Sequence, residues 1–377
     1  MDITVNKIKS LKGEIEIPAD KSITHRAFMF SALTKGKCRI INFSKGADCL
    51  STLEIIKQLG CNIGYINDKE LIINASNALK QPLEALNCGN SGTTTRLISG
   101  ILAGQKFNSS LYGDESLSKR PMKRVIAPLE LMGAKFKHND YKLPIEIIGS
   151  KLHGIDYVSP LASAQVKSCI LLAGLNAEGK TSFTESYKSR NHTELMFEYM
   201  GADIKTEGNK VTISKSQLNS VDINICGDIS SASFFIVAGL IVPNSDITIK
   251  NVGINETRRG IIDVLKAMNG NIEILNERII SNEKVADIRI RYSELKATVI
   301  QGSIIPTLID EIPVLAVAAT QAEGTTIIKD ASDLRNKEAD RITAVRKELE
   351  KLGADIKEAP DGFIINGKTE LFGNCET

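Results

Sequence analysis

The sequence predicts an α/β protein built from repeated units, with apolar helices buried inside and sheets on the outside. Three observations support this prediction. A helix that ends in Leu or Met, then a glycine, then a short strand recurs five times along the 377 residues. A second helix, rich in small and apolar residues, precedes each copy. The length exceeds what one ordinary core occupies and fits two domains.

The glycine in each copy marks the end of a helix. A glycine just after the last helical residue is a C-cap signal, because the chain there turns through positive φ. The next residues, such as Cys61-Asn-Ile and Ala354-Asp-Ile, are typical of a strand. The helix ends that carry the pattern are residues 53–60, 128–133, 195–201, 264–270 and 349–353.

The upstream helices are apolar on nearly every face, so we expect them to be buried on all sides. A short strand follows most of them, and each unit then reads helix, strand, helix, strand, strand. Such self-similarity indicates one supersecondary block used repeatedly. Since the apolar helices fill the interior, the sheets should face solvent. The predicted buried helices are residues 25–33, 93–103, 165–175, 231–240 and 312–319.

The composition excludes several classes of protein. With 42% hydrophobic and 24% charged residues, it is typical of a soluble globular chain. The chain lacks a run of about 18 apolar residues that would predict a membrane helix. Residues 1–12 lack the apolar core of a signal peptide, so we expect a cytoplasmic protein without a membrane partner. A net charge of +2, no Trp and 5% aromatic residues argue against nucleic-acid binding.

Seven cysteines and four histidines are scattered without metal-ligand spacing. No CxxC pair occurs, and an odd number of cysteines without a framework predicts reduced thiols and no metal site. We expect each thiol to behave as a small buried hydrophobe. The cysteines are residues 38, 49, 61, 88, 169, 226 and 375.

Groups that suit an anionic ligand stand where the buried helices begin. Lys21, Ser22 and Arg26 lie at a helix start, where free backbone N–H groups and the positive dipole end favour an anion. Residues 87–96 form a Gly/Ser/Thr-rich loop that runs into a helix, which is typical of an anion cradle. The loop lacks the Gly-Lys-Ser/Thr ending of a nucleotide P-loop, which argues against an NTPase.

Further polar segments extend this pattern. In residues 113–122 a proline would fix the aim of Arg120, and a guanidinium grips a carboxylate or phosphate with two hydrogen bonds. Lys337, Glu338 and Arg341 would share one face if a helix has begun, since residues i and i+4 meet. Acids close to bases suit proton transfer. The remaining polar segments are Ser163-Ala-Gln165, residues 187–194 and Asp310-Glu311.

Each segment also has a plainer interpretation. Capped helix ends, tight turns and solvated surface ion pairs account for any one of them. In all five units, however, polar or charged groups gather where a buried helix begins. Two domains built in this way would point several helix N-termini at one interdomain cleft, which predicts a small polyanionic ligand.

In this order, the motifs resemble those of the EPSP synthase family, the 5-enolpyruvylshikimate-3-phosphate synthases of aromatic amino-acid biosynthesis. The resemblance covers essentially the whole chain. It implies that phosphoenolpyruvate and shikimate 3-phosphate are the substrates and that neither a metal nor an organic cofactor is needed. The motifs are Lys21-Ser22, Asn90-Ser-Gly-Thr93, Arg120-Pro-Met122, Ser163-Ala-Gln165, Arg190-Asn-His-Thr-Glu194, Asp310-Glu311 and Asn336-Lys-Glu-Ala-Asp-Arg341.

The resemblance also implies two domains of three units each. The chain would cross between them near Asp20 and near Asp228. The first domain would then be discontinuous, with residues 1–20 and 228–377, and the second would hold residues 21–227. Only five units are present, and the family's Asp-His-Arg segment and the Lys near its C-terminus are absent. We therefore expect the last repeat to be missing and the first domain to be incomplete.

The functional residues of the family carry over onto matching positions. Asp310 would take the proton of the shikimate 5-hydroxyl, and Glu338 together with Lys21 would serve the methylene carbon, which makes these three the expected catalytic residues. The family often has a second serine where Ala164 stands, so the backbone there would replace one hydroxyl contact. The expected shikimate 3-phosphate ligands are Lys21, Ser22, Arg26, Ser163, Ala164, Gln165, Arg190, Asp310 and Lys337, and the expected phosphoenolpyruvate ligands are Lys21, Gly92, Arg120, Gln165 and Arg341.

The implied reaction is an addition followed by an elimination, catalysed by a monomer. The 5-hydroxyl attacks C2 of phosphoenolpyruvate while C3 gains a proton, and the tetrahedral intermediate then loses inorganic phosphate. One alternative is the sister enzyme that makes UDP-N-acetylglucosamine enolpyruvate, which usually carries a reactive cysteine where residues 113–121 contain none. A second alternative is a truncated protein that binds shikimate 3-phosphate without catalysis.

Overall fold

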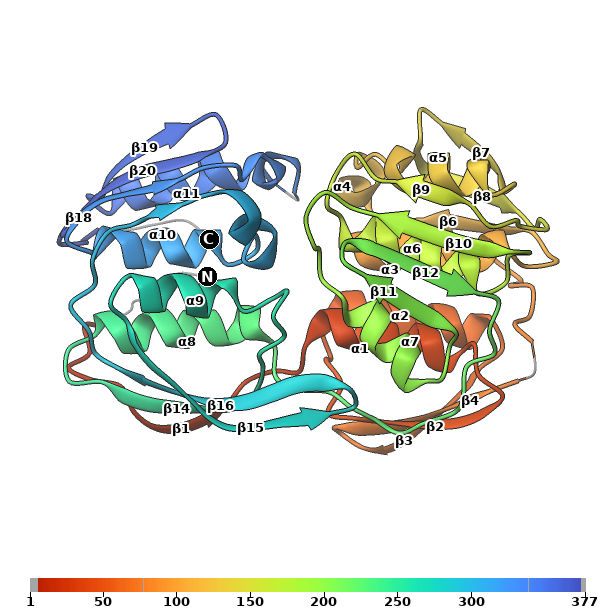
Figure 1. The fold of residues 1–377 in the computed structure, drawn as a ribbon, viewed down its shortest axis with the longest axis horizontal. Coiled ribbons are helices and arrows are strands. Elements are labelled where there is room, and N and C mark those ends of the chain that lie inside the picture. Colours follow the sequence, from red (N-terminus) through yellow and green to blue (C-terminus); the bar gives the residue numbers. More distant parts are fainter. Residues whose placement is uncertain (1–5, 77, 338, 374–377) are drawn as a thin grey trace. The chain divides into compact units, whose positions relative to one another are not determined.

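Helices and sheets form two units in this computed structural model, which describes residues 6–76, 78–337 and 339–373. In each unit the helices lie inside and the sheets lie outside (Figure 1). The arrangement agrees with the apolar character of the predicted helices. The two units are unit 1 (residues 1–18, 226–279 and 284–377) and unit 2 (residues 19–225 and 280–283).

The helices form where the sequence predicts them, with ends that differ by a few residues. Unit 2 holds α1 (Lys21–Ser31), α2 (Ala47–Gln58), α3 (Gly92–Ala103), α4 (Glu115–Ser118), α5 (Lys123–Leu131), α6 (Ala164–Gly174) and α7 (His192–Tyr199). Unit 1 holds α8 (Ile229–Ile241), α9 (Gly260–Ala267), η1 (Gly302–Thr307), α10 (Ile312–Thr320), η2 (Ser332–Asn336) and α11 (Arg341–Lys351), of which η1 and η2 are 3₁₀ helices.

The described part of the chain contains five four-stranded sheets. In unit 2 they are β13 (Ile223–Asn224), β2 (Gly36–Ile41), β4 (Glu70–Ala75) and β3 (Asn62–Asn67); β5 (Leu86–Asn87), β6 (Ser109–Tyr112), β8 (Lys142–Ile148) and β7 (Lys135–Asn139); and β9 (Asp156–Val158), β10 (Lys180–Thr184), β12 (Lys210–Ser214) and β11 (Ile204–Glu207). The other two are β1 (Lys12–Glu16), β14 (Asp246–Gly253), β16 (Glu283–Arg291) and β15 (Asn271–Ile280); and β17 (Val299–Ile300), β18 (Gly324–Ile328), β20 (Gly362–Gly367) and β19 (Asp355–Ala359).

All five sheets share one pairing pattern. One edge strand runs parallel to its neighbour, as β13 does to β2 and β17 does to β18. The third strand then runs antiparallel to the second, as β4 does to β2. A repeated sequence pattern therefore produces the same sheet each time, which is what one block used repeatedly predicts.

Two helices of unit 2 show the predicted burial on all sides. Every residue from 23 to 31 of α1 and from 166 to 174 of α6 is buried. In the same core the rings of Phe30 and Phe197 stack with their centroids 4.4 Å apart. Helices without a polar face are stable here because neighbouring elements cover them all round.

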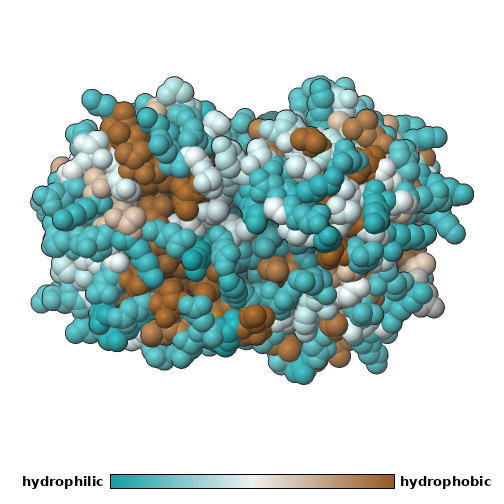
Figure 2. Space-filling model, in the orientation of Figure 1, coloured by the Kyte–Doolittle hydropathy of each residue, from teal (hydrophilic) through white to brown (hydrophobic). Residues whose placement is uncertain are grey.

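The prediction of burial on all sides is wrong for α8. Phe234 and Phe235 of this helix are 64% and 43% exposed, and apolar surface lies over the region of α8 in Figure 2. Ile236 and Leu240, in contrast, belong to the core of unit 1. The described residues cover one side of α8 only, so its apolar sequence does not lead to complete burial.

The glycine C-caps are confirmed at four of the five predicted positions. Asn269, with φ of 69°, takes the left-handed position after α9 in place of Gly270. A Cβ at Gly270 would lie 2.6 Å from the Leu265 carbonyl oxygen, so this glycine serves close packing instead. The four glycines that do turn through positive φ are Gly60, Gly133, Gly201 and Gly353, at 98°, 94°, 78° and 89°.

The six cysteines in the described part of the chain are all buried. The predicted role of these thiols as buried hydrophobes is thereby confirmed, while Cys375 lies outside the described residues. Among the residues that the structure describes, we find no helix of the length and apolarity needed to cross a membrane.

Candidate active site

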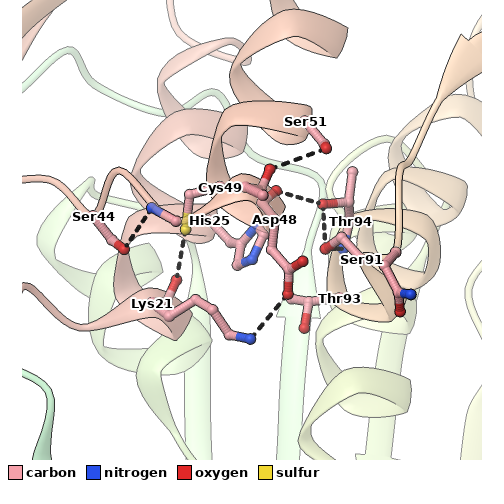
Figure 3. A network of polar contacts seen from close by, with 12 residues as sticks. Lys21, His25, Ser44, Asp48, Cys49, Ser51, Ser91, Thr93 and Thr94 are labelled. Atoms are coloured by element: carbon pink, nitrogen blue, oxygen red, sulfur yellow. Dashed lines mark hydrogen bonds and ion pairs between the residues drawn. The ribbon is translucent and has the colours of Figure 1, made fainter. Parts of the chain in front are cut away.

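The first site segment lies at the start of α1. Asp20 caps the helix by accepting a hydrogen bond from Ile23 N at 2.8 Å. Lys21 is the first helical residue, and its Nζ lies 2.9 Å from Asp48 Oδ2 in the first turn of α2 (Figure 3). The Lys21 side chain is 51% exposed, so water screens this ion pair and the ammonium group can still bind an anion. Sequence reasoning missed Asp48, which lies 27 residues further along the chain.

A buried hydrogen-bond chain, one helical turn after Lys21, joins α1, α2 and α3. His25 Nδ1 lies 2.7 Å from Thr52 Oγ1, which in turn lies 2.7 Å from Thr94 Oγ1. Thr94 donates a hydrogen bond to Ser91 Oγ, the cap of α3. Burial, and then the positive charge of Lys21, lower the pKa of His25 to about 3, so the ring is neutral at physiological pH.

Arg26 is buried and ties α1 to α6 and α7. Its Nε donates to Thr193 Oγ1 and its Nη2 to Ser168 Oγ, both at 2.8 Å. Its Nη1 donates to the Ser22 carbonyl oxygen at 2.9 Å. Burial is the main cause that lowers the pKa of Arg26 to about 10, and the charge of Arg190 contributes. The guanidinium therefore remains protonated, with only 3% of the residue exposed.

Two guanidinium groups converge at Gly92, the first residue of α3. A Cβ added to Gly92 would lie 2.9 Å from Arg96 Nη1 and 3.4 Å from Arg120 Nη1. Arg96 Nη1 donates to Gln165 Oε1 at 2.6 Å, and Arg120 donates to Asn90 Oδ1. A position without a side chain, beside two cations and at a helix start, suits a small anion.

Gln165 places the start of α6 next to the start of α3. Its Nε2 donates to Thr93 Oγ1 at 3.0 Å, in addition to the bond from Arg96. Ser163 caps α6, which makes Ala164 its first helical residue. Sequence reasoning did not select Arg96 as a ligand, although its place one helical turn after Gly92 puts both residues on one face.

Buried ion pairs anchor the loop that carries Arg190. Lys167 Nζ lies 2.8 Å from Glu185 Oε1 and 2.7 Å from Glu194 Oε1. Glu185 also accepts hydrogen bonds from Ser189 N and Oγ, at 2.9 and 2.6 Å. The residue before Arg190 is thus bonded to a carboxylate that Lys167 neutralises, which restricts the position of the loop.

Unit 1 brings together three other predicted site residues. Lys337 Nζ lies 3.3 Å and Arg341 Nη1 lies 3.5 Å from Oδ1 of Asp310. Arg341 is the first residue of α11, so its positive charge stands at a helix start. Glu338 lies outside the described residues. Arg258, which sequence reasoning missed, approaches the other carboxylate oxygen of Asp310.

Comparison with known proteins decides the family. A family model described as EPSP synthase (3-phosphoshikimate 1-carboxyvinyltransferase) matches residues 5–374. The chain belongs to the EPSP synthase family. A 3-phosphoshikimate 1-carboxyvinyltransferase of Thermoanaerobacter sp. (strain X514) is 51% identical over 376 residues, which are 99% of this chain and 89% of that protein.

Two further EPSP synthase relatives agree. The 3-phosphoshikimate 1-carboxyvinyltransferase of Geobacillus thermodenitrificans (strain NG80-2) is 52% identical over 371 residues, 97% of this chain and 86% of that protein. A solved EPSP synthase structure from Acinetobacter baumannii matches with a TM-score of 0.86 and 44% identity, covering 96% of this chain and 82% of that one.

Membership of the EPSP synthase family confirms two expectations. The family itself and its inside-out α/β fold are those that the sequence predicts. The relatives also favour the shikimate enzyme over the UDP-N-acetylglucosamine alternative. The roles of individual EPSP synthase site residues in this chain stay predictions, to which the contacts described above add Asp48, Arg96 and Arg258.

Proposed function

We propose that this chain transfers the enolpyruvyl group of phosphoenolpyruvate to the 5-hydroxyl of shikimate 3-phosphate and releases inorganic phosphate. The observation that carries the proposal is the convergence of Arg96 and Arg120 at Gly92, in a chain that belongs to the EPSP synthase family. Both substrates are anions with phosphate and carboxylate groups. Cations at helix starts supply the charge and the hydrogen-bond donors that such groups need.

Shikimate 3-phosphate binds to groups of both units in this proposal. Its phosphate and hydroxyl groups contact donors at the starts of α1 and α6, and Asp310 and Lys337 contact the ring from unit 1. Arg26 lies deeper than the others, and it acts through its charge and by holding Ser22 in place. The proposed ligands are Lys21, Ser22, Arg26, Ser163, the backbone of Ala164, Gln165, Arg190, Asp310 and Lys337.

Phosphoenolpyruvate binds next to Gly92. Arg120 has the planar donor geometry that grips a carboxylate or phosphate with two hydrogen bonds. The missing side chain at Gly92 leaves the space that the ligand occupies, because a Cβ there meets both guanidinium groups. The proposed ligands are Lys21, Gly92, Arg120, Gln165 and Arg341.

The reaction requires two proton movements and one bond exchange. Asp310 accepts the proton of the 5-hydroxyl as its oxygen attacks C2, while Glu338 with Lys21 delivers a proton to C3. The same groups then remove a proton from C3 as the C2–O bond to phosphate breaks. Cations fixed before the reaction begins stabilise the changing anions, and this electrostatic effect is commonly the largest contribution to catalysis. The proposed mechanism uses neither a metal nor an organic cofactor.

The proposal also covers the organisation of the enzyme. The catalytic form is a cytoplasmic monomer, with a first domain of residues 1–20 and 228–377 and a second domain of residues 21–227. The division of the chain into units after residues 18 and 225 supports these bounds.

Phosphate release from phosphoenolpyruvate tests the function. We expect release with shikimate 3-phosphate and none with UDP-N-acetylglucosamine as the acceptor. The Asp310→Asn variant should lower kcat by about 10²- to 10⁴-fold, because the general base is lost. Thermal stabilisation by shikimate 3-phosphate should remain, since the unit 2 ligands are intact.

The fully exposed Asp68, changed to Asn, is the matched control and should keep wild-type kcat. Turnover with the UDP-sugar, or an Asp310→Asn variant as fast as the wild type, would contradict the proposal. Thermal stabilisation by shikimate 3-phosphate without any phosphate release would instead support the alternative of a binding protein.

A further inference from the structure

A short turn in unit 1 presents an arginine that belongs to none of the motifs used above. Asn255 Oδ1 accepts hydrogen bonds from Thr257 N at 2.9 Å and from Thr257 Oγ1 at 2.8 Å. Arg258 N donates to the Asn255 carbonyl oxygen at 2.8 Å. All three residues are buried, and α9 begins two residues later. A side-chain amide that bonds to the backbone two residues on is a turn-forming device, and here it fixes the direction of Arg258.

The guanidinium of Arg258 reaches the starts of two helices. Its Nη2 donates to Ser230 Oγ at 2.7 Å and lies 3.4 Å from Oδ1 of Asp228, the cap of α8. The same nitrogen lies 3.6 Å from Oε1 of Glu311, at the start of α10, and Ser230 also donates to that carboxylate oxygen. Nη1 lies 3.7 Å from Oδ2 of Asp310.

Arg258 and the two other cations approach Asp310 from different sides. Lys337 and Arg341 both contact Oδ1, whereas Arg258 faces Oδ2. Lys337 and Arg341 have partly exposed side chains that can turn towards a ligand, but the Arg258 side chain is only 4% exposed. Arg258 is therefore the cation whose position a bound substrate cannot change.

Glu311 explains why a charge is kept at this depth. Its side chain is completely buried, and a buried carboxylate is strongly unfavourable unless a cation and hydrogen bonds compensate it. Arg258 and Ser230 supply both. The cluster then holds three acids, Asp228, Asp310 and Glu311, and three bases, Arg258, Lys337 and Arg341.

We propose that Arg258 is a positioning residue for Asp310. It holds the Oδ2 side of the carboxylate, and it neutralises Glu311 behind it, so that Asp310 stays ionised and keeps one orientation while Lys337 and Arg341 engage the substrates. The proposal rests on the function proposed above, in which Asp310 accepts the proton of the 5-hydroxyl. Arg258 itself contacts neither substrate.

Steady-state kinetics of Arg258→Gln test this role. Losing the cation leaves Asp310 free to turn and favours its protonated form, so kcat should fall on the order of tenfold or more while both KM values change less than about threefold. The acid limb of the kcat profile should move to higher pH by about one unit, because a nearby positive charge lowers a carboxyl pKa. Arg258→Lys should recover part of kcat and move the acid limb back.

The neighbouring Arg259, which is partly exposed and pairs with Asp263, offers a matched control. Arg259→Gln should keep the wild-type kcat and pH profile. A folded Arg258→Gln variant, as judged by thermal stabilisation with shikimate 3-phosphate, that keeps both would overturn the proposal. A wild type and an Arg259→Gln variant that release no phosphate would instead overturn the proposed function, and this inference with it.

Unfolding of Arg258→Gln is met by a second variant. In Arg258→Met with Glu311→Gln, one cation and one anion disappear together, so the cluster stays neutral and no buried carboxylate is left uncompensated. The positioning role predicts that this double variant binds shikimate 3-phosphate but shows the same loss of kcat. A double variant with wild-type kcat would show that Arg258 serves folding alone.

Discussion

At the residue scale, burial decides the charge of several site side chains. His25 is the clearest case, since its ordinary pKa of 6.5 falls to about 3 in the folded protein. Between these two values the unfolded chain binds the proton and the folded chain does not. Stability contributed by the neutral ring is therefore complete above about pH 6.5 and is lost as the pH falls towards 3.

Urea unfolding at pH 7.5 and pH 5.0 tests this linkage. The free energy of unfolding of the wild type should fall by about 2 kcal/mol from this group, since each unit of pKa difference is worth about 1.4 kcal/mol. His25→Gln should lose that part of the pH dependence, and the exposed His153, changed to Gln, should keep it. The same pH dependence in all three proteins would contradict the assignment to His25.

At the element scale, helix starts were predictable from the sequence, but the ion pairs between elements were not. Asp20, Ser91 and Ser163 are short polar residues before apolar runs, and all three cap helices as such residues should. The partners of Lys167 lie 18 and 27 positions away along the chain, and no local pattern relates them. Only the packing of α6 against the loop and α7 brings these charges together.

The buried cluster around Lys167 should be costly to break. Lys167→Met would leave Glu185 and Glu194 buried without their cation, which typically destabilises a protein by about 3–5 kcal/mol. Lys205→Met removes an exposed partner of Glu207 and should cause no measurable change. The free energies of unfolding in urea compare the two variants. Equal losses would mean that burial of the first ion pair has no energetic weight.

At the scale of the whole molecule, the repeated units make an interior that excludes reagents as well as water. Burial raises the pKa of the Cys49 thiol to about 12 and that of the Cys88 thiol to about 11. Thiolate is the reactive form, so these cysteines should be inert in the native protein. The six described cysteines are spread over both units and report on each of them.

Titration with a thiol reagent such as DTNB tests this in a Cys375→Ser background. The native protein should show no rapidly reacting thiol, and six should react once guanidinium has unfolded it. Saturating shikimate 3-phosphate should leave the result for the unfolded protein unchanged. Rapid reaction of any thiol in the native state would show that one of the units opens far more readily than its packing indicates.

The sequence by itself determined the repeated unit, the buried helices, their polar starts and the family, because helix periodicity, capping and motif order are local or linear properties of a chain. Tertiary structure alone decided which charges meet: Asp48 with Lys21, Arg96 with Gln165, and Arg258 with Asp310. It also decided that one side of α8 is exposed and that Asn269 replaces Gly270 in the turn. These outcomes depend on what packs against each element, which is set by residues far away along the chain.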